Sequence, residues 1–371
     1  MSYTIITARA VLQAIRTFSA RLSLPAAERY LWLAGMSWKV LITAHSLSVE
    51  AVGGRALERL EEAGCEVIHA RKYGPLTEAE LLPQLPGINA VMAGMDQFTE
   101  AVLGSREAAE LKIISRWGIG IDAVNLSAAA QLGIVVANTP GLLNEAVADY
   151  AMGMMLALAR RIPEGWLSLR EGRWEAFWGP GLGGKTLGLV GCGGIGQAVA
   201  KRARGFDMRL LACDPAPSAD AERLGIEFVT FDRLLAESDF ISLHTALTPA
   251  TRGLIGEAQL RAMKPSAYLI NTARGAVIDE AALAMALREN WIAGSALDVF
   301  TIEPLPPNHP LHSVPNLLLT PHLASLGYES GACVSAAVVD AILDVRAGRR
   351  PRWVVNPEVY QSPALRVPLK S

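Results

Sequence analysis

Four polar residues in the second half of the sequence could carry proton and anion chemistry at one place. His322 and Arg274 follow the apolar runs NLLLTP and AYLINTA, and Asp298 and Glu303 lie at and just beyond the end of the run AGSALDV. Near-continuous apolar runs of this kind are typical of buried parallel strands. Because ligands in open α/β sheets bind beyond the carboxyl ends of strands, we expect the four side chains to converge on one crevice.

This set of side chains suits the transfer of hydrogen at an alcohol carbon. Oxidation of an alcohol requires a base for the hydroxyl proton and the reverse reaction requires an acid, and histidine serves in both roles. Glu303 would orient the ring of His322 and favour imidazolium. Arg274 would hold a substrate carboxylate with its planar fork. Because Glu303 and Arg274 are expected beside it, His322 is better explained as a proton carrier than as a core histidine with satisfied nitrogens.

The stretch TLGLVGCGGIGQAVAKRA, residues 186–203, predicts a dinucleotide site. Gly191, Gly193 and Gly196 have G-x-G-x-x-G spacing between an apolar strand and a helix. They permit a tight turn, close approach of a pyrophosphate, and close packing of helix on strand. The next strand ends in Asp214, whose carboxylate can accept hydrogen bonds from the adenosine ribose and repels a 2′-phosphate. We therefore expect NAD rather than NADP.

The elements that position these residues alternate between strand and helix almost throughout. Short apolar runs separated by helical patterns predict an α/β fold with two Rossmann-like, doubly wound parallel-sheet domains and a cleft between them. The expected strands are 39–44, 65–70, 88–94, 112–118 and 133–139 in the first set, and 186–191, 209–214, 227–231, 240–246, 267–273, 293–299 and 316–321 in the second. Residues 145–162, apolar nearly all round, predict a buried helix.

Composition excludes several classes of partner. The 34 Lys and Arg and 36 Asp and Glu residues are dispersed and give a net charge of −2, which does not indicate a nucleic-acid or anionic-membrane surface. The longest stretch without these residue types, 304–328, has six prolines and cannot be a spanning helix. The four cysteines show no metal-binding spacing and are typical of reduced cytoplasmic thiols. We expect no metal site.

Two segments leave alternatives open. Residues 1–37 are best explained as an N-terminal extension, but their basic, amphipathic start also permits a targeting segment or a packing helix. Trp166, Trp174 and Trp178 lie in an aromatic, glycine-rich segment that fits a subunit contact in a homodimer. Packing of the same side chains on their own chain is the other explanation.

The motifs GCGGIG, NTARG, ALDVFTIEP and LTPHLAS, in this order, resemble the D-isomer-specific 2-hydroxyacid dehydrogenase family. SRWGIGIDAVN and EAVADYA extend the resemblance over about residues 38–358. It implies an NAD-dependent oxidoreductase that interconverts a D-2-hydroxy acid and its 2-keto acid. The first half is closest to the phosphoglycerate dehydrogenase-like branch, and hydroxypyruvate and glyoxylate reductases belong to the same family.

The resemblance also implies roles for individual residues. Arg274, Glu303 and His322 would be catalytic, and Asp298 would bind the nicotinamide carboxamide. Other positions would contact the cofactor or the substrate: Gly194 and Ile195 on the pyrophosphate, Thr272 and Ala273 on the cofactor, and the backbone of Ile119 and Gly120 on the substrate carboxylate. Gly194 departs from the family, in which many members have arginine there.

The family fold implies a cofactor domain at residues 145–322 and a discontinuous substrate domain at 38–144 and 323–360, followed by a tail at 361–371. The alternative to an enzyme is a binding module that senses NAD(H), because the C-terminal-binding-protein corepressors resemble this family. Turnover of a keto acid would distinguish the two. Phosphite oxidation is disfavoured because relatives with that activity have a lysine where Ile119 stands.

Overall fold

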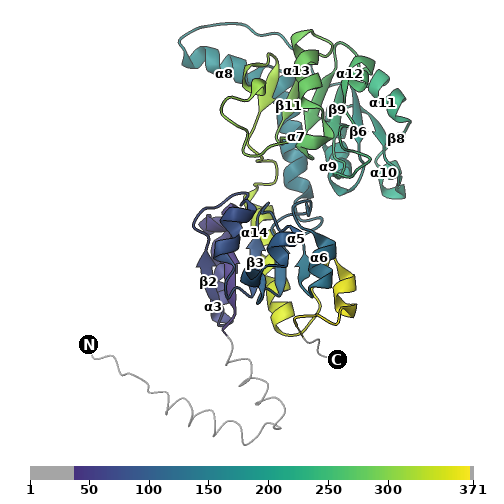
Figure 1. The fold of residues 1–371 in the computed structure, drawn as a ribbon. Coiled ribbons are helices and arrows are strands. Elements are labelled where there is room, and N and C mark those ends of the chain that lie inside the picture. Colours follow the sequence, from purple (N-terminus) through teal and green to yellow (C-terminus); the bar gives the residue numbers. More distant parts are fainter. Residues whose placement is uncertain (1–36, 368–371) are drawn as a thin grey trace, which may run out of the picture.

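The expected alternation of strands and helices is found throughout residues 37–367, which are the part of the chain that the computed structural model describes. Each of the twelve expected runs contains a strand, and the strands form two fully parallel sheets in two lobes (Figure 1). The predicted fold class is confirmed. The alternatives for the N-terminal extension concern residues 1–36, which lie outside the described residues.

The first lobe contains a five-stranded sheet in the order β2-β1-β3-β4-β5. Chain order reverses between β1 and β3, as in a doubly wound sheet. The strands are β1 (Lys39–Ile42), β2 (Glu66–His69), β3 (Ala90–Ala93), β4 (Ile113–Arg116) and β5 (Val135–Ala137), and the helices of this lobe are α3 (Arg55–Glu62), α4 (Glu78–Leu81), α5 (Glu100–Leu103), α6 (Leu126–Gln131) and α14 (Tyr328–Arg346).

The second lobe contains a seven-stranded sheet in the order β12-β11-β10-β9-β6-β7-β8, with the reversal between β6 and β9. Its strands are β6 (Thr186–Val190), β7 (Arg209–Cys213), β8 (Glu227–Phe228), β9 (Phe240–Leu243), β10 (Tyr268–Asn271), β11 (Gly294–Leu297) and β12 (Leu317–Leu319). The helices are α7 (Asn144–Ala159), α8 (Ile162–Arg170), α9 (Gly194–Ala203), α10 (Ala219–Arg223), α11 (Phe231–Glu237), α12 (Glu257–Ala262) and α13 (Glu280–Arg288).

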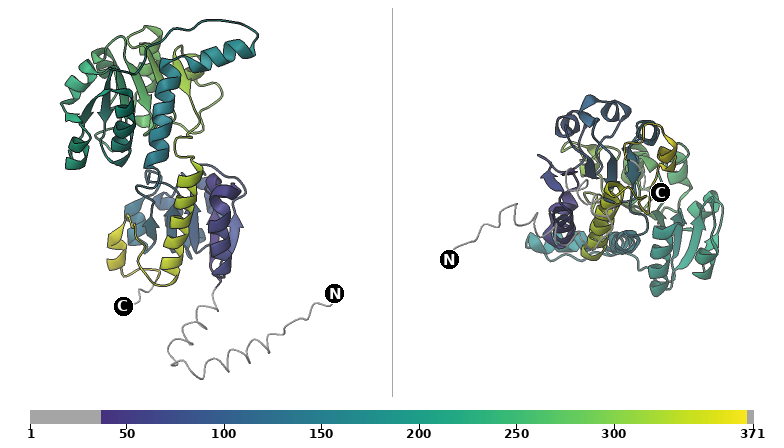
Figure 2. Two further views of the ribbon diagram at one scale, coloured as in Figure 1. Left: turned by 180° about the vertical axis from the view of Figure 1, so that it is seen from behind. Right: turned by 90° about the horizontal axis from the view of Figure 1, so that it is seen from below.

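The chain passes between the lobes twice, before α7 and before α14, and both helices begin at the junction (Figure 2). The second passage returns the chain to the first sheet, where the Ser115 hydroxyl donates to the Val338 carbonyl at 3.0 Å and the Trp117 indole donates to Ser335 at 3.0 Å. Beyond α14, Arg366 donates to the Leu132 and Leu111 carbonyls, both at 2.8 Å. The described part of the tail, residues 361–367, therefore packs on the first lobe. The assignment of the two lobes to substrate and cofactor, with its exact bounds, stays a prediction.

Helix α7 differs from its prediction on one face. Val147, Met152 and Met155 are buried, and α7 packs on α9 and on the seven-stranded sheet. On the opposite side, Asp149 and Gly153 are exposed. The expectation of a helix buried all round is wrong there, because the apolar pattern continues onto a face that this chain leaves uncovered.

Helix α8 and residues 171–178 form an arm that projects from the second lobe (Figures 1 and 2). Trp174 is 93% and Trp178 91% exposed, and Trp166 is also largely exposed. The explanation that these side chains pack on their own chain is therefore wrong for Trp174 and Trp178. Within residues 37–367, no helix combines the length and the apolar character that crossing a membrane would require.

Candidate active site

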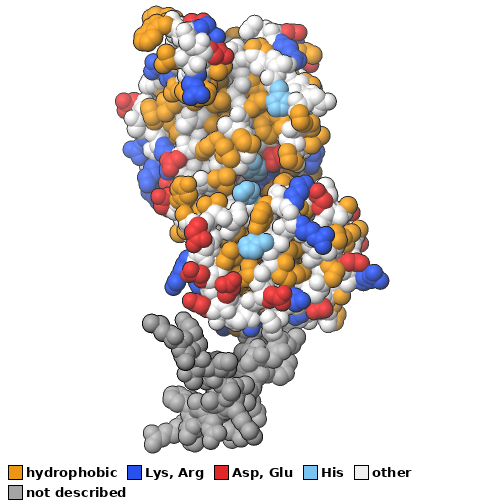
Figure 3. Space-filling model, turned by 90° about the vertical axis from the view of Figure 1, so that its left-hand side faces the viewer, with side chains coloured by type: hydrophobic (Ala, Val, Ile, Leu, Met, Phe, Trp, Pro, Cys, Tyr) orange, Lys and Arg blue, Asp and Glu red, His pale blue; other side chains and the backbone are white. Residues whose placement is uncertain are grey.

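A cavity of about 1000 Å³ lies between the two lobes, and both sheets point the carboxyl ends of their strands into it. The first lobe contributes residues that follow β1, β3 and β4, and the second contributes residues that follow β10, β11 and β12. Figure 3 shows histidine and hydrophobic side chains gathered around the junction of the lobes. Two sheets that face each other in this way can place polar groups on both sides of one small molecule.

His322 and Glu303 are joined by a short hydrogen bond in this cavity. His322 Nδ1 lies 2.7 Å from Glu303 Oε2, and Glu303 Oε1 accepts from the Phe300 N–H at 2.9 Å. Burial acts to raise the pKa of Glu303, but the hydrogen bond and charge of His322, with the Phe300 N–H and Arg274, outweigh burial and lower the pKa overall. Glu303 is therefore held as a carboxylate beside the imidazole.

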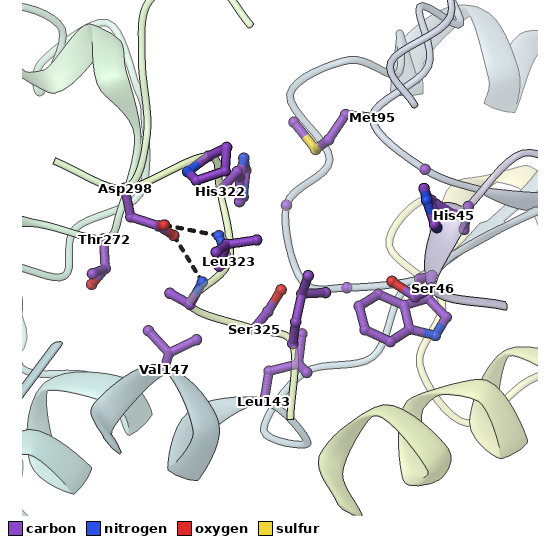
Figure 4. A pocket seen from close by; sticks show the side chains of 18 of the residues that line it. His45, Ser46, Met95, Leu143, Val147, Thr272, Asp298, His322, Leu323 and Ser325 are labelled. Carbon is purple, nitrogen blue, oxygen red and sulfur yellow. Dashed lines mark hydrogen bonds between the residues drawn. The ribbon is translucent and has the colours of Figure 1, made fainter. Parts of the chain in front are cut away.

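The backbone of His322 has a left-handed conformation, with φ at +57°, which is uncommon for a residue other than glycine. The loop around it is fixed by Asp298. The Asp298 carboxylate accepts from the Thr320 hydroxyl at 2.6 Å and from the N–H groups of Leu323 and Ala324, both at 2.8 Å. Figure 4 shows Asp298 and His322 on one side of the cavity, with Met95 and His45 opposite.

Asp298 thus has a role that the sequence did not indicate. It is fully buried, and burial raises its pKa while its three donors act against that rise. Its carboxylate holds the loop that carries His322 in a strained conformation. A contact with a nicotinamide carboxamide, the predicted role, is compatible with this position at the cavity wall.

Arg274 crosses the cleft from the end of β10 and contacts the first lobe. Its Nε donates to Asp122 Oδ2 at 2.5 Å and its Nη1 donates to the Ala273 carbonyl at 2.7 Å. The guanidinium rests on Gly120, because a Cβ atom at residue 120 would lie 1.5 Å from Arg274 Nη2. The structure therefore brings Arg274 against the backbone predicted to face the substrate carboxylate. Asp122 was missed, although it stands two residues after Gly120 in the same motif.

The glycine loop after β6 lies at the reversal point of the seven-stranded sheet. Gly191 has φ at +89°, and a Cβ at Gly196 would lie 2.5 Å from the Gly191 carbonyl oxygen. A Cβ at Gly193 would meet no atom within 4 Å, so the loop is open to a ligand there. Helix α9 begins at Gly194 without a side-chain cap, which leaves its first N–H groups free for an anion.

Two further observations bear on a dinucleotide. The Thr272 hydroxyl is buried at the cavity wall and has no hydrogen-bond partner within the described residues. Asp214, after β7, accepts from the N–H groups of Cys192 at 2.6 Å and Ala216 at 2.8 Å, so each carboxylate oxygen retains capacity for a ribose hydroxyl. An orphaned hydroxyl, an open glycine loop and a fixed carboxylate along one sheet edge fit NAD.

The departure at Gly194 has a local explanation. A Cβ at Gly194 would lie 2.3 Å from Asn144 Nδ2, so the amide of Asn144 occupies the space that a larger side chain would need. Asn144 begins α7 and lines the cavity. Asn144 was not predicted from the sequence, because an asparagine at the start of a helix gives no specific signal of a contact with Gly194.

The structure brings the predicted site residues of the second lobe to one sheet edge, with Ile119 and Gly120 facing them from the first lobe, but not all of them line the cavity. Those that line it are Ile119, Gly120, Ile195, Thr272, Arg274, Asp298, Glu303 and His322. The other predicted positions are Gly191 and Gly193 on the loop after β6, Gly194 and Gly196 in the first turn of α9, Asp214 after β7, and Ala273, which is buried next to Arg274. Their roles as binding residues stay predictions.

Other charged and titratable groups near the cleft are already paired. Arg116 lines the cavity, but Nη1 donates to the Ala93 and Trp117 carbonyls and Nη2 contacts Met95 Sδ; burial, with Arg274 nearby, lowers its pKa to about 10. His244 lies under the glycine loop, and burial lowers its pKa to about 4.

Comparison with known proteins gives consistent matches. A family model described as D-isomer specific 2-hydroxyacid dehydrogenase, NAD binding domain, matches residues 152–324. The glyoxylate reductase of Korarchaeum cryptofilum is 45% identical over 261 residues, which cover 68% of this chain and 79% of the relative. The D-3-phosphoglycerate dehydrogenase of Archaeoglobus fulgidus is 38% identical over 84% of this chain, which spans 59% of that relative.

Solved structures agree with the sequence matches. The crystal structure of TT0316 protein from Thermus thermophilus superposes with a TM-score of 0.77 and 42% sequence identity, covering 85% of this chain and 99% of that protein. The similarity therefore extends over both lobes.

Proposed function

The chain belongs to the D-isomer-specific 2-hydroxyacid dehydrogenase family, and from this premise we propose that it reduces an unphosphorylated 2-keto acid to the D-2-hydroxy acid, and catalyses the reverse. It is an NAD-dependent oxidoreductase, in agreement with the predicted activity and cofactor. The observation that carries the proposal is the His322–Glu303 pair at 2.7 Å, in the same cavity as Arg274.

The chain's own residues account for binding and proton transfer. NAD, when bound along the edge from Asp214 to Thr272, supplies the hydride acceptor or donor. Arg274 and the backbone of Ile119 and Gly120 bind the substrate carboxylate and orient C2. In the reductive direction His322 donates its proton to the C2 oxygen, and in the oxidative direction it accepts the hydroxyl proton.

Glu303 and Asp298 support that proton transfer without reacting. The carboxylate of Glu303 stabilises the imidazolium and fixes the ring through Nδ1, which leaves Nε2 for the substrate. Asp298 holds the loop on which His322 stands. Closure of the lobes would expel water from around these charges and strengthen their interactions.

The charges around the cleft favour a substrate without a phosphate. A phosphate on the substrate would need a free basic side chain at the cavity, and we consider Arg71, Lys72 and Arg116 of the first lobe. Lys72 pairs with Glu80 at 2.8 Å, and neither it nor Arg71 is among the residues that line the cavity. Arg116 is committed to backbone carbonyls. The similarity to proteins named glyoxylate reductase supports an unphosphorylated keto acid.

The experiment is a steady-state assay of NADH oxidation with glyoxylate, hydroxypyruvate and phosphohydroxypyruvate, repeated with NADPH. We expect turnover of an unphosphorylated keto acid with NADH and a lower kcat/KM for phosphohydroxypyruvate. His322→Asn, which tolerates a left-handed backbone, should lose about 10²–10⁴-fold in kcat and still bind NADH. NADH binding without turnover of any keto acid would instead indicate a nucleotide-sensing binding module.

The homodimer is a further part of the proposal. The exposed arm, with Trp174 and Trp178, and the open face of α7 are two surfaces of the second lobe that this chain leaves uncovered. A groove of about 810 Å³ lies along that face, lined by residues that include Gly153, Met154 and Ala157. Trp174→Ser with Trp178→Ser should shift the mass measured by light scattering from dimer to monomer, whereas Phe206→Ser should not. A monomeric wild type at micromolar concentration would contradict this.

A cytoplasmic location is proposed from cysteine chemistry. Within residues 37–367 all four cysteines are free, and Cys65 and Cys192 are buried. Free thiols in a chain of this size fit a reducing compartment. Fractionation of cells that express the protein should find it with cytoplasmic markers, and recovery with any other compartment would overturn the assignment.

A further inference from the structure

Most of the large hydrophobic side chains that are exposed within residues 37–367 gather in two places. One is the arm that we assign to a subunit contact. The other is the cleft, where Val49, Ile119, Leu326 and Tyr328 are exposed and line the cavity. Exposed apolar side chains are ordinary when scattered, but a contiguous group in a concave site marks a surface that a ligand covers.

On the first lobe, two members of this group and four neighbouring residues of the cavity wall form what we call the apolar subsite: Val49, Val52, Met95, Trp117, Tyr328 and Gly331. Its floor is closely packed. A Cβ at Gly331 would lie 3.0 Å from Val52 Cγ1 and 3.6 Å from Trp117 Cζ2. The Trp117 indole is held by its hydrogen bond to Ser335. The floor is therefore built by α14 and the end of β4, not by flexible side chains.

The apolar subsite has no charge to offer a polar substituent. Within the described residues, the first lobe's wall of the cavity includes neither Lys nor Asp nor Glu, and its one arginine is Arg116, which is committed to backbone carbonyls and Met95. Two polar side chains of this wall are His45 and Ser46, which follow β1. His45 is engaged with Ser48 at 3.2 Å and its ring packs against Tyr73 with centroids 5.6 Å apart.

The three groups on C2 of a 2-keto acid determine which part of the substrate contacts the apolar subsite. C2 carries three groups: the carboxylate, which Arg274 and Gly120 take; the oxygen, which His322 takes; and the C3 substituent. The nicotinamide side of the cleft belongs to the second lobe, through Thr272 and Asp298. The C3 substituent is therefore left to extend toward the first lobe.

We infer that the apolar subsite selects 2-keto acids with a branched or aromatic hydrocarbon substituent at C3, in preference to glyoxylate. The inference rests on the proposed function, since it assigns the third group of the same substrate. Covering this wall with a hydrocarbon chain removes apolar surface from water, and each methylene that is buried favours binding about fourfold. Glyoxylate, which has a hydrogen in place of that chain, leaves this apolar surface exposed to water.

The test compares kcat/KM for 4-methyl-2-oxopentanoate, phenylpyruvate and glyoxylate, with NADH and the full chain. We expect the branched or the aromatic keto acid to exceed glyoxylate by about tenfold or more. Met95→Gln and Tyr328→Gln should each reduce that ratio severalfold. Met285→Gln, which changes a half-exposed methionine on α13 outside the cavity, is the matched control and should leave the ratio unchanged.

The outcomes separate this inference from the function on which it rests. If no keto acid is reduced, the proposed function fails. If glyoxylate is reduced and both larger keto acids are poorer substrates, the function stands and the apolar subsite is wrong. A preference for the larger keto acids that the Met95 and Tyr328 variants leave unchanged would also overturn the assignment, because the selectivity would then come from another wall.

Discussion

Replacing Glu303 with glutamine isolates the charge of the His322–Glu303 pair. The amide keeps one oxygen, which can accept from the Phe300 N–H that lies 2.9 Å from Glu303 Oε1, and it turns its NH2 group toward His322 Nδ1. The packing of the loop should therefore survive. What disappears is the negative charge beside the imidazole, and with it the preference for the protonated ring.

The size of the effect follows from the distance and the exposure. Unit charges 2.7 Å apart attract by about 6 kcal/mol at an effective dielectric constant of about 20. The side chains are 34% and 22% exposed, so solvent screens much of this, and about 1.5–3 kcal/mol is the usual contribution of a hydrogen bond to a charged group. At about 1.36 kcal/mol per tenfold in rate, loss of this stabilisation should slow proton donation by about 10–10²-fold.

The assay is kcat/KM for keto-acid reduction, in which His322 is the proton donor. In Glu303→Gln kcat/KM should fall by about 10–10²-fold, while NADH binding, followed by fluorescence, stays as in the wild type. The matched control is Glu280→Gln, because Glu280 lies 3.8 Å from His309 outside the cleft. A kcat/KM that does not fall, or falls equally in both variants, would refute the reasoning.

Three further predictions use the same structure. Gly120→Ala should reduce kcat/KM by about 10²-fold, because the new Cβ would displace Arg274. Gly205→Ala, whose Cβ would have no atom within 4 Å, should leave kcat/KM unchanged. Equal kinetics of the two variants would show that Arg274 does not need this position. Asp214→Ala should raise kcat/KM for NADPH relative to NADH by about tenfold, and an unchanged ratio would remove that carboxylate from cofactor selection. Burial lowers the pKa of His244 from 6.5 to about 4, so between these values the unfolded chain binds a proton that the folded chain does not, and the protein loses stability as the pH falls. In denaturant unfolding, the free energy of unfolding lost between pH 7 and pH 5 should be about 1–2 kcal/mol smaller in His244→Asn than in the wild type.

The strands and their grouping could be predicted because buried parallel strands are apolar along their whole length. The same logic placed Arg274, Glu303 and His322 together, since residues at the carboxyl ends of neighbouring strands share an edge. Glu303 and His322 are 19 positions apart in sequence, yet they touch because β11 and β12 are adjacent. Strand order itself came only with the structure.

What the sequence could not supply were contacts that depend on backbone conformation or on the second lobe. The left-handed conformation of His322 has no signature in residue type, and the role of Asp298 as the anchor of that loop follows from it. Asp122 reaches Arg274 across the cleft, a contact that needs the relative placement of two sheets. The exposed face of α7 was mispredicted because apolar composition does not distinguish a core from an uncovered surface.

The cross-cleft contact of Arg274 with Asp122 has a kinetic consequence. Each positive group at the cavity faces a negative one: Arg274 meets Asp122, His322 meets Glu303, and buried Arg116 lies near Asp96. The cleft therefore projects little net positive field into solvent, and an anionic keto acid is not drawn in from a distance. Its association rate should be nearly independent of ionic strength, and recognition begins only when the carboxylate arrives and competes with Asp122 for the guanidinium.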